Sequence, residues 1–283
     1  MNQTRPALSL AAALVVALPL LSACSGSKSS DSTPSGPTGT AEEMYSHGID
    51  ALNARRFSTA DEQFNAVEAN YPYSSWAVNA QLMYGYSLYQ QNKYTDAIGQ
   101  LDRFIQLHPA HRDIAYAYYL RALSYYEQIA DIQRDQKGTE QAMNALQEVV
   151  NRFPDTSYAR DAKLKIDLCV DHLAGKEMEI GRYYQKQHLY EAAIGRFQRV
   201  VNEYQTTNHV PEALLRLTEI YLTLGLPEQA RQTAAVLGYN YPGSDWYRDS
   251  YNQLVRDGVA TGNEIPEEER PKGFFTRMWD SVF

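Results

Sequence analysis

The residues that could carry out chemistry are few and widely spaced in this chain of 283 residues. His108 and His111 lie three positions apart, but Pro109 between them is typical of a helix end, and we expect no metal site there. Cys169 and His172 could act as a nucleophile and its base only with a third group that orients the histidine. The sequence around them supplies no such group, so we expect Cys169 to be a small buried apolar residue.

Other features of catalysis are equally sparse. The carboxylates at 42–43 and 267–269 indicate a solvated surface or a linker. The glycine-rich phosphate loop, the dinucleotide fingerprint, the zinc-protease helix and the nucleophile elbow are all missing from the sequence. We therefore expect no catalytic residue, no bound metal and no enzymatic activity. A pair of catalytic acids cannot be recognised from sequence alone, so an acidic enzyme with an unrecognised site stays open as an alternative.

The charge balance bears on the class of partner. The formal net charge is −8 with a pI near 5.3, and no basic cluster occurs, which argues against a nucleic-acid partner. The hydrophobic fraction of 44% is sufficient for a packed core. Tyrosine is unusually frequent, with 22 residues against 8 phenylalanines. Tyrosine rings can be partly buried while the hydroxyl stays at a surface, which favours a binding surface.

The first 23 residues form the pattern of an export signal. Arg5 precedes an apolar run from 7 to 20, which is shorter than the ~20 residues of a membrane span, and Leu21-Ser22-Ala23-Cys24 follows. This tetrapeptide resembles a bacterial lipobox, and that resemblance implies that Cys24 carries diacylglycerol and an N-acyl chain. An ordinary cleaved signal that leaves a free cysteine is the alternative. No other cofactor is expected.

Residues 24–40 are expected to be a flexible tether. Ser, Thr, Gly and Pro occupy 14 of these 17 positions, so the segment has too little apolar surface to fold. The predicted anchor and tether would attach a folded body to a membrane, because two or more acyl chains are needed for stable anchoring.

A repeat of about 34 residues organises the segment 41–257. Proline closes most units, and small residues recur at fixed distances before it, where two antiparallel helices would approach most closely. The register places the small residues and prolines at Gly48, Ala60, Pro72, Gly85, Ala97, Pro109, Ala122, Ala142, Pro154, Gly181, Ala193, Ala230 and Pro242. The expected units are 41–74, 75–111, 112–156, 157–207 and 211–244, followed by a capping helix at 245–257.

Two of these units need adjustment. In the third, a first helix over 114–129 is followed by about eight extra residues, which a loop at 131–138 absorbs. In the fourth, Gln205 replaces the proline, and the segment from 158 to about 188 is long enough for one extended helix or two collinear ones. The pattern leaves open whether Gly175 breaks it.

This register resembles the tetratricopeptide repeat. The resemblance implies an all-α, right-handed superhelical solenoid of about five helix hairpins with a C-terminal capping helix. It also implies that the first helix of each hairpin lines a concave face. The positions on that face form the predicted peptide groove, which consists of Tyr45, Asn79, Tyr86, Tyr89, Tyr116, Tyr119 and Tyr126. The alternative is that about half of these tyrosines only pack between neighbouring helices.

The C-terminal segment 258–283 divides into two parts. Its first part is an acidic linker around Pro266. Its last part is amphipathic, because the apolar residues fall on one helical stripe that consists of Phe274, Phe275, Met278, Trp279, Val282 and Phe283. Such a stripe requires a partner surface.

Taken together, the lipobox, the tether, the repeats and this tail resemble the BamD family of outer-membrane lipoproteins. The resemblance implies a scaffold anchored by lipid in the outer membrane and facing the periplasm. Its implied partners are the POTRA domains of BamA, other Bam subunits and unfolded barrel precursors. Arg196 matches the family position that pairs with a POTRA carboxylate, although it could equally be a solvated charge. The alternative function is a tetratricopeptide lipoprotein that regulates peptidoglycan enzymes.

Overall fold

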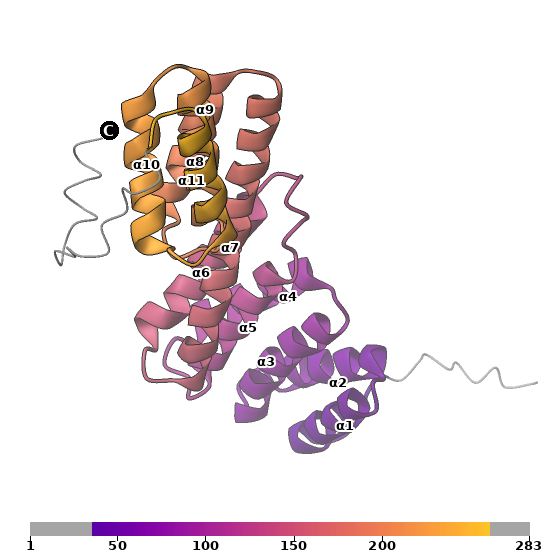
Figure 1. Cartoon of the computed structure of the whole chain (residues 1–283). Coiled ribbons are helices and arrows are strands. Elements are labelled where there is room, and N and C mark those ends of the chain that lie inside the picture. The colour runs from indigo at the N-terminus through magenta and orange to yellow at the C-terminus, as the bar shows by residue number, and fades with distance from the viewer. Residues whose placement is uncertain (1–35, 261–283) are drawn as a thin grey trace, which may run out of the picture. The chain divides into compact units, whose positions relative to one another are not determined.

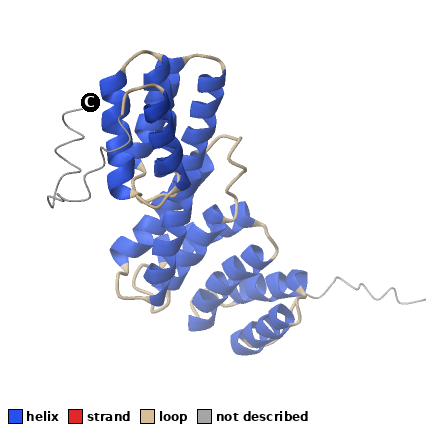
Figure 2. Cartoon of the chain, in the orientation of Figure 1, coloured by secondary structure: helices blue, strands red, loops and turns tan. Residues whose placement is uncertain are grey.

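The computed structural model describes residues 36–260, which fold as α-helices joined by short connections, with no strand in that range (Figures 1 and 2). The predicted signal peptide, Cys24, residues 24–35 of the predicted tether and the tail from 261 onwards lie outside the described residues. The helices are α1 (Ala41–Asn53), α2 (Phe57–Asn70), α3 (Ser75–Gln90), α4 (Tyr94–Leu107), α5 (Ile114–Tyr126), α6 (Lys137–Arg152), α7 (Ser157–Lys186), α8 (Tyr190–Glu203), α9 (Val210–Thr223), α10 (Pro227–Asn240) and α11 (Asp245–Arg256).

The helices from α1 to α10 pack mainly on the helices next to them in the chain, and α11 packs most closely on α9. This is the contact pattern of stacked hairpins, in which each repeat buries its apolar face against the following one. The predicted all-α array of about five tetratricopeptide-type hairpins with a C-terminal cap is confirmed. No helix among the described residues has the length and apolarity needed to cross a membrane.

Glycines mark the closest approach within three of the hairpins. A Cβ atom placed on Gly48 would lie 2.6 Å from the ring of Phe64, and one on Gly181 would lie 2.5 Å from the ring of Phe197. Gly85 stands in the same relation to Leu101, at 2.9 Å. Since real Cβ atoms do not approach other carbons this closely, the small residue of the first helix is required by the large residue of the second.

The turn inside the hairpin repeats in every hairpin except α5–α6. Arg55, Asn92, His188 and Gly225 all have positive φ values, between 55° and 71°. In each case the next backbone N–H donates to a carbonyl five residues earlier, as from Arg56 to Ala51 at 2.8 Å. These bonds satisfy carbonyls at the end of the first helix and turn the chain into the second.

The turn between hairpins is set by the residue before the proline. Tyr71, His108, Phe153 and Tyr241 have φ from −129° to −135° and ψ of 52° or 53°, outside the helical region that proline disfavours for its predecessor. Tyr204 has nearly the same values, −123° and 42°, although Gln205 follows it. The fourth hairpin therefore makes the same turn without proline.

The segment from 158 to about 188, for which the sequence allowed one extended helix or two collinear ones, is one unbroken helix. The 30-residue α7 passes through Gly175, and a Cβ there would lie 2.4 Å from Cδ1 of Ile132. The prediction of a first helix over 114–129 was wrong at its end, because α5 stops at Tyr126 and the connection begins there. This connection lies against α7, where Nε2 of His172 is 3.0 Å from the carbonyl oxygen of Ala130.

The buried residues form three clusters along the chain. The first joins α1 to α3, the second joins α3 to the first half of α7, and the third joins the second half of α7 to α11. Tyr84 and Tyr86 pack against both of the first two clusters. The second and third have no residue in common, so α7 and the connection that packs on it join them.

Candidate functional site

The predicted groove contains a continuous band of aromatic rings on α3, α5 and α7. The ring centroids of Tyr86 and Tyr116 are 6.5 Å apart, and those of Tyr116 and Tyr158 are 5.7 Å apart. Tyr119 stacks on Tyr158 at 5.1 Å with an angle of 29° between the planes. Offset and tilted pairs at these distances are favourable for aromatic rings, so the rings fix one another in position.

Polar side chains of α7 bind the end of this aromatic band that lies on α7. The hydroxyl of Tyr119 donates to Oδ2 of Asp161, which also lies 3.1 Å from Nζ of Lys165. The hydrogen bond from Tyr119 and the nearby ammonium lower the pKa of Asp161 below its usual value. The same ammonium lies 5.5 Å from the ring centroid of Tyr126, which is a cation–π distance.

Tyr89 extends the band towards the end of α3. Its ring lies 5.6 Å from that of Tyr94, and its hydroxyl donates a long hydrogen bond of 3.4 Å to Glu127. Burial, followed by the charge of Glu127, raises the pKa of Tyr89 to about 12. Burial also raises the pKa of Tyr116 and of Tyr119 well above the ordinary value. The hydroxyls therefore stay protonated and can donate at neutral pH.

Five of the predicted groove residues are thus brought together, namely Tyr86, Tyr89, Tyr116, Tyr119 and Tyr126. Tyr45 makes a separate contact, since its ring lies 5.1 Å from Trp76 and 5.9 Å from Phe64 in the first cluster. Asn79 is half-buried on α3, and no ring or hydrogen-bond contact joins it to the tyrosines within residues 36–260. We call these five tyrosines and Tyr158 the tyrosine face.

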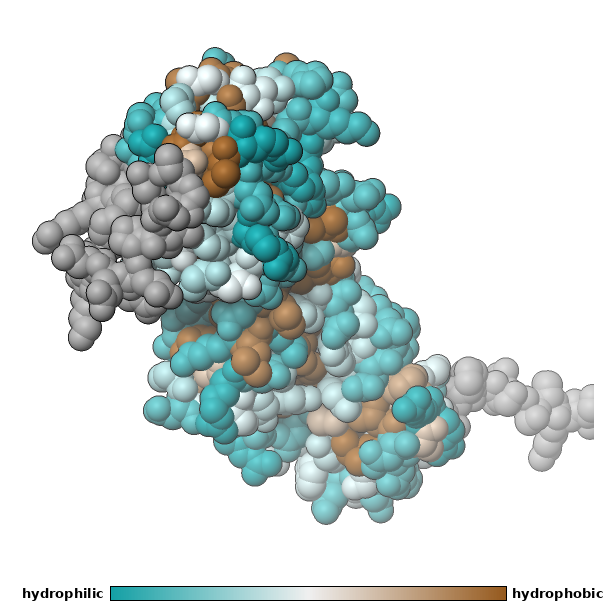
Figure 3. Space-filling view, viewed as in Figure 1, coloured by the Kyte–Doolittle hydropathy of each residue, from teal (hydrophilic) through white to brown (hydrophobic). Residues whose placement is uncertain are grey.

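Every ring of the tyrosine face is half-buried. Each ring packs on neighbouring side chains and also presents part of its surface to solvent. In Figure 3, brown hydrophobic residues interrupt the hydrophilic surface in the middle of the described part, where α5 to α7 lie in Figure 1; tyrosine itself is pale on this scale and is not among the brown residues. A rigid aromatic surface with polar tips can bury a large area of a partner at a small cost in side-chain entropy.

Sequence reasoning missed the residues of this site that α7 contributes. Tyr158, Asp161 and Lys165 are spaced three and four residues apart, so they share one side of a helix. That spacing was a usable signal, but the repeat register assigned the start of α7 to no concave position.

Arg196 on α8 is already engaged within the chain. Its Nη1 atom lies 2.9 Å from Oε2 of Glu177 on α7, and Nη1 of Arg199 lies 2.9 Å from the other carboxylate oxygen. Glu177 is only 7% exposed. A nearly buried carboxylate requires compensation, so both arginines serve the packing of α7 on α8. The guanidinium of Arg196 is still about one-third exposed and can accept a second carboxylate.

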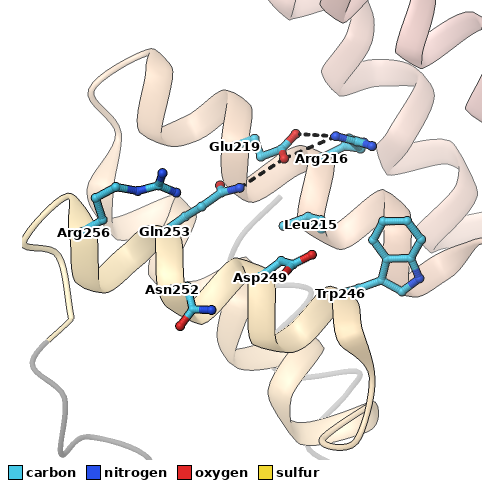
Figure 4. Close-up of a pocket in the computed structure, with 8 residues that line it drawn as sticks. All are labelled: Leu215, Arg216, Glu219, Trp246, Asp249, Asn252, Gln253 and Arg256. Atoms are coloured by element: carbon cyan, nitrogen blue, oxygen red, sulfur yellow. Dashed lines mark hydrogen bonds and ion pairs between the residues drawn. The ribbon is translucent and has the colours of Figure 1, made fainter.

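A pocket of about 510 Å³ opens between α9 and α11 (Figure 4). Glu219 is its central group and accepts hydrogen bonds from Arg216, Gln253 and Gln185. Its other lining residues are Leu215, Trp246, Asp249, Asn252 and Arg256. Two acidic and two basic side chains balance in this pocket, so it favours neither anions nor cations.

The remaining candidates for chemistry have structural roles. Cys169 is buried, and burial raises the pKa of its thiol to about 11, which leaves it protonated and unreactive at neutral pH. His172 bonds to the carbonyl of Ala130 rather than activating that thiol. His108 lies 2.9 Å from the side-chain oxygen of Gln81. Among the described residues no group of three or more His, Cys, Asp or Glu side chains could hold a metal ion.

Stacked helix hairpins of this kind define a helical-repeat protein. The family model described as YfiO, outer membrane lipoprotein, matches residues 37–237. This match covers well over half of the chain, and the chain belongs to that family.

Relatives that are named outer membrane protein assembly factor BamD share much of the sequence. One from Caulobacter vibrioides is 49% identical over 262 residues, covering 93% of this chain and 85% of the relative. One from Rickettsia prowazekii is 46% identical, covering 88% and 96%. A third, from Neisseria meningitidis, is 36% identical and covers 72% and 80%. These relatives are named as assembly factors, which agrees with the non-enzymatic role expected from the sequence.

Proposed function

We propose that this chain is a lipid-anchored scaffold of the outer-membrane β-barrel assembly complex, facing the periplasm. In this proposal the tyrosine face binds segments of unfolded barrel precursors, and the C-terminal hairpins bind the POTRA domains of BamA. Family membership and the names of the relatives support the general role. The tyrosine face supports the proposed binding of precursor segments.

One observation carries the precursor-binding proposal. Six half-buried tyrosine rings on three helices are held in place by one another and by Asp161 and Lys165. Barrel strands alternate apolar with polar side chains and carry many aromatic residues. An extended segment of that kind would lay its aromatic side on the rings and direct backbone groups to the tyrosine hydroxyls.

The test is photocrosslinking in cells from positions on the tyrosine face, compared between the native chain and a variant with Tyr86, Tyr89 and Tyr119 replaced by Ala. We expect crosslinks to precursors to fall at least fivefold, because the variant loses most of the exposed ring surface. The matched control replaces Tyr73 and Tyr183, which are exposed and lie outside the face. Equal crosslinking by all three proteins, at unchanged helical content, would reject the proposal.

The lipid anchor is a separate part of the proposal. Cys24 would carry diacylglycerol and an N-acyl chain, and Cys24→Ser would then release the protein from the membrane fraction into the soluble periplasm. Membrane fractionation with and without high salt measures this directly. Continued membrane association of Cys24→Ser in high salt would count against the anchor.

The alternative function is an adaptor of peptidoglycan enzymes. Pull-down of the native chain separates the two proposals, since the first requires recovery of BamA and the second requires recovery of a hydrolase or synthase.

A further inference from the structure

One side of α7 is covered by neighbouring residues along the second half of the helix but is exposed along the first half. Residues spaced four, three, four and seven apart return to the same side of a helix. On α7 a line of such residues consists of Leu164, Leu168, Asp171, Gly175 and Arg182. Along the second half, α9 covers it, because Oδ2 of Asp171 lies 3.7 Å from Nε2 of His209 and Nη1 of Arg182 lies 3.1 Å from Glu212.

Along the first half, the same line is bare. The side chains of Leu164 and Leu168 are 65% and 57% exposed. The next helix of the array, α9, begins only at Val210, beside Asp171 and Gly175, and α8 pairs with the second half of α7. The two leucines therefore lie where an adjacent helix would continue the stack, and together they leave a small apolar surface on α7 uncovered.

This bare surface is continuous with the tyrosine face. Asp161 and Lys165, which bind Tyr119 and contact the ring of Tyr126, lie one turn or less from Leu164 on the same helix. A ligand on the leucines therefore lies directly beside the edge of the tyrosine face.

We propose that the C-terminal tail of this same chain, residues 274–283, docks on Leu164 and Leu168 as an amphipathic helix. The tail has six apolar residues on one helical stripe, with Arg277 and Asp280 outside it. Burying such a stripe against exposed leucines removes apolar surface of both segments from water.

The position where the described chain ends makes this docking geometrically feasible. The N–H of Ala260 donates to the carbonyl of Leu254, so the chain leaves the array beside the end of α11. Gln253 lies against Glu219 near the end of α9, and His209 at its start lies against Asp171. The helical rise over ten residues of α9 and three of α7 is about 20 Å, and crossing two helix separations of ~10 Å brings the direct distance to Leu168 to about 30 Å. The twelve residues 261–272 can span up to ~40 Å when extended.

The docking itself does not depend on the proposed function, since it concerns two segments of one chain. Its test therefore needs no precursor.

The test is disulfide formation between Leu168→Cys and Trp279→Cys in the full chain, in lysates of cells that produce it. Oxidation with copper phenanthroline should give an intramolecular link, identified by faster migration without reductant and by mass spectrometry of the linked peptides. The matched control pairs Trp279→Cys with Lys163→Cys, an exposed position on the charged side of α7. Cys169 is buried and its thiol is protonated, so it does not compete.

We expect the Leu168 pair to form at least five times more intramolecular disulfide than the Lys163 pair. Phe275→Glu together with Met278→Glu should abolish the difference, because charges on the stripe prevent its burial. Equal yields from the two pairs, or no intramolecular link, would overturn the proposal. A disulfide-linked dimer or a link to another protein would also overturn it, since the occupant would then be a second copy or a partner.

A second measurement avoids crosslinking. The single variant Leu168→Cys should react with a maleimide at least threefold faster when residues 273–283 are deleted, and Lys163→Cys should react at the same rate with and without the tail. An unchanged rate at position 168 would contradict docking.

Discussion

At the residue scale, Arg196 forms an ion pair within the chain and is also proposed to bind a carboxylate of a POTRA domain. Its bond to the nearly buried Glu177 means that a charge reversal to Glu would place two carboxylates together and destabilise the packing of α7 on α8. Arg199 makes an equivalent bond to the same carboxylate from the next helical turn. Arg199 is therefore the matched control for the loss of an ion pair to Glu177.

We predict that Arg196→Ala and Arg199→Ala lower the unfolding free energy by similar amounts, about 1–2 kcal/mol, because each leaves Glu177 with one arginine. Only Arg196→Ala should weaken co-purification with BamA, by at least fivefold, if the POTRA contact is made. Equal loss of BamA from both variants would show that Arg196 acts through the fold alone.

Also at the residue scale, the tyrosine face predicts how stability responds to high pH. Burial raises the pKa of Tyr116 in the folded state above its unfolded value near 10, so the folded state keeps a proton that the unfolded state loses. That contribution is complete below about pH 10 and is lost as the pH rises through the folded pKa.

Tyr116→Phe should therefore lose less stability than the native chain between pH 10 and 11, by about 1 kcal/mol. Urea unfolding followed by circular dichroism at pH 9, 10 and 11 measures the difference. Tyr73→Phe is the control, because the ring of Tyr73 is fully exposed. The explanation fails if Tyr116→Phe shows the same dependence as the native chain.

At the scale of the elements, two glycines of one hairpin have opposite roles. A Cβ on Gly181 of α7 meets the buried ring of Phe197, whereas one on Gly195 of α8 meets nothing within 4 Å. Gly181→Ala should therefore destabilise the chain by about 1–3 kcal/mol through overpacking, despite the better helix propensity of alanine. Gly195→Ala should stabilise it by roughly 0.5–1 kcal/mol.

Thermal unfolding of the two variants measures these effects, and the opposite signs are the decisive result. If both alanines stabilised the chain, the close approach of α7 and α8 would not constrain position 181.

The same small residues explain how much of the fold was predictable. Gly48, Gly85 and Gly181 each face a large residue of the second helix, and this pairing sets which side of the first helix points inward. Once that rotation is fixed, the outward positions of the same helix follow. The assignment of Tyr86, Tyr89, Tyr116, Tyr119 and Tyr126 to one face rests on the resemblance to the tetratricopeptide repeat.

The parts that sequence did not predict involve α7 and its neighbours. The first half of this 30-residue helix packs on the preceding hairpin, and its second half forms the next hairpin with α8. The 34-residue register covers only the second half, so it does not assign Tyr158, Asp161 or Lys165. The bond between Arg196 and Glu177 depends on the crossing of α7 and α8, and residue spacing along the chain does not encode it.

At the scale of the whole molecule, one helix and one connection join the central and C-terminal buried clusters of the described chain. Besides the backbone of α7, the join consists of Ile132 seated on Gly175, His172 bonded to the carbonyl of Ala130, and Nζ of Lys176 bonded to the carbonyl of Gln133 at 3.0 Å. In a repeat array, each unit is stabilised mainly by its neighbours, so weakening this join should uncouple the two sides.

We predict that Ile132→Asp combined with His172→Ala separates one unfolding transition into two. Hydrogen exchange measured by mass spectrometry should show α9 to α11 opening with a different free energy from α3 to α6, whereas the native chain opens both together. The control is Gln133→Ala, which removes a side chain but keeps the carbonyl that Lys176 binds. If the double variant still opens as one unit, α7 alone couples the two clusters, and binding at the tyrosine face would be transmitted to the C-terminal hairpins through that helix rather than through the connection.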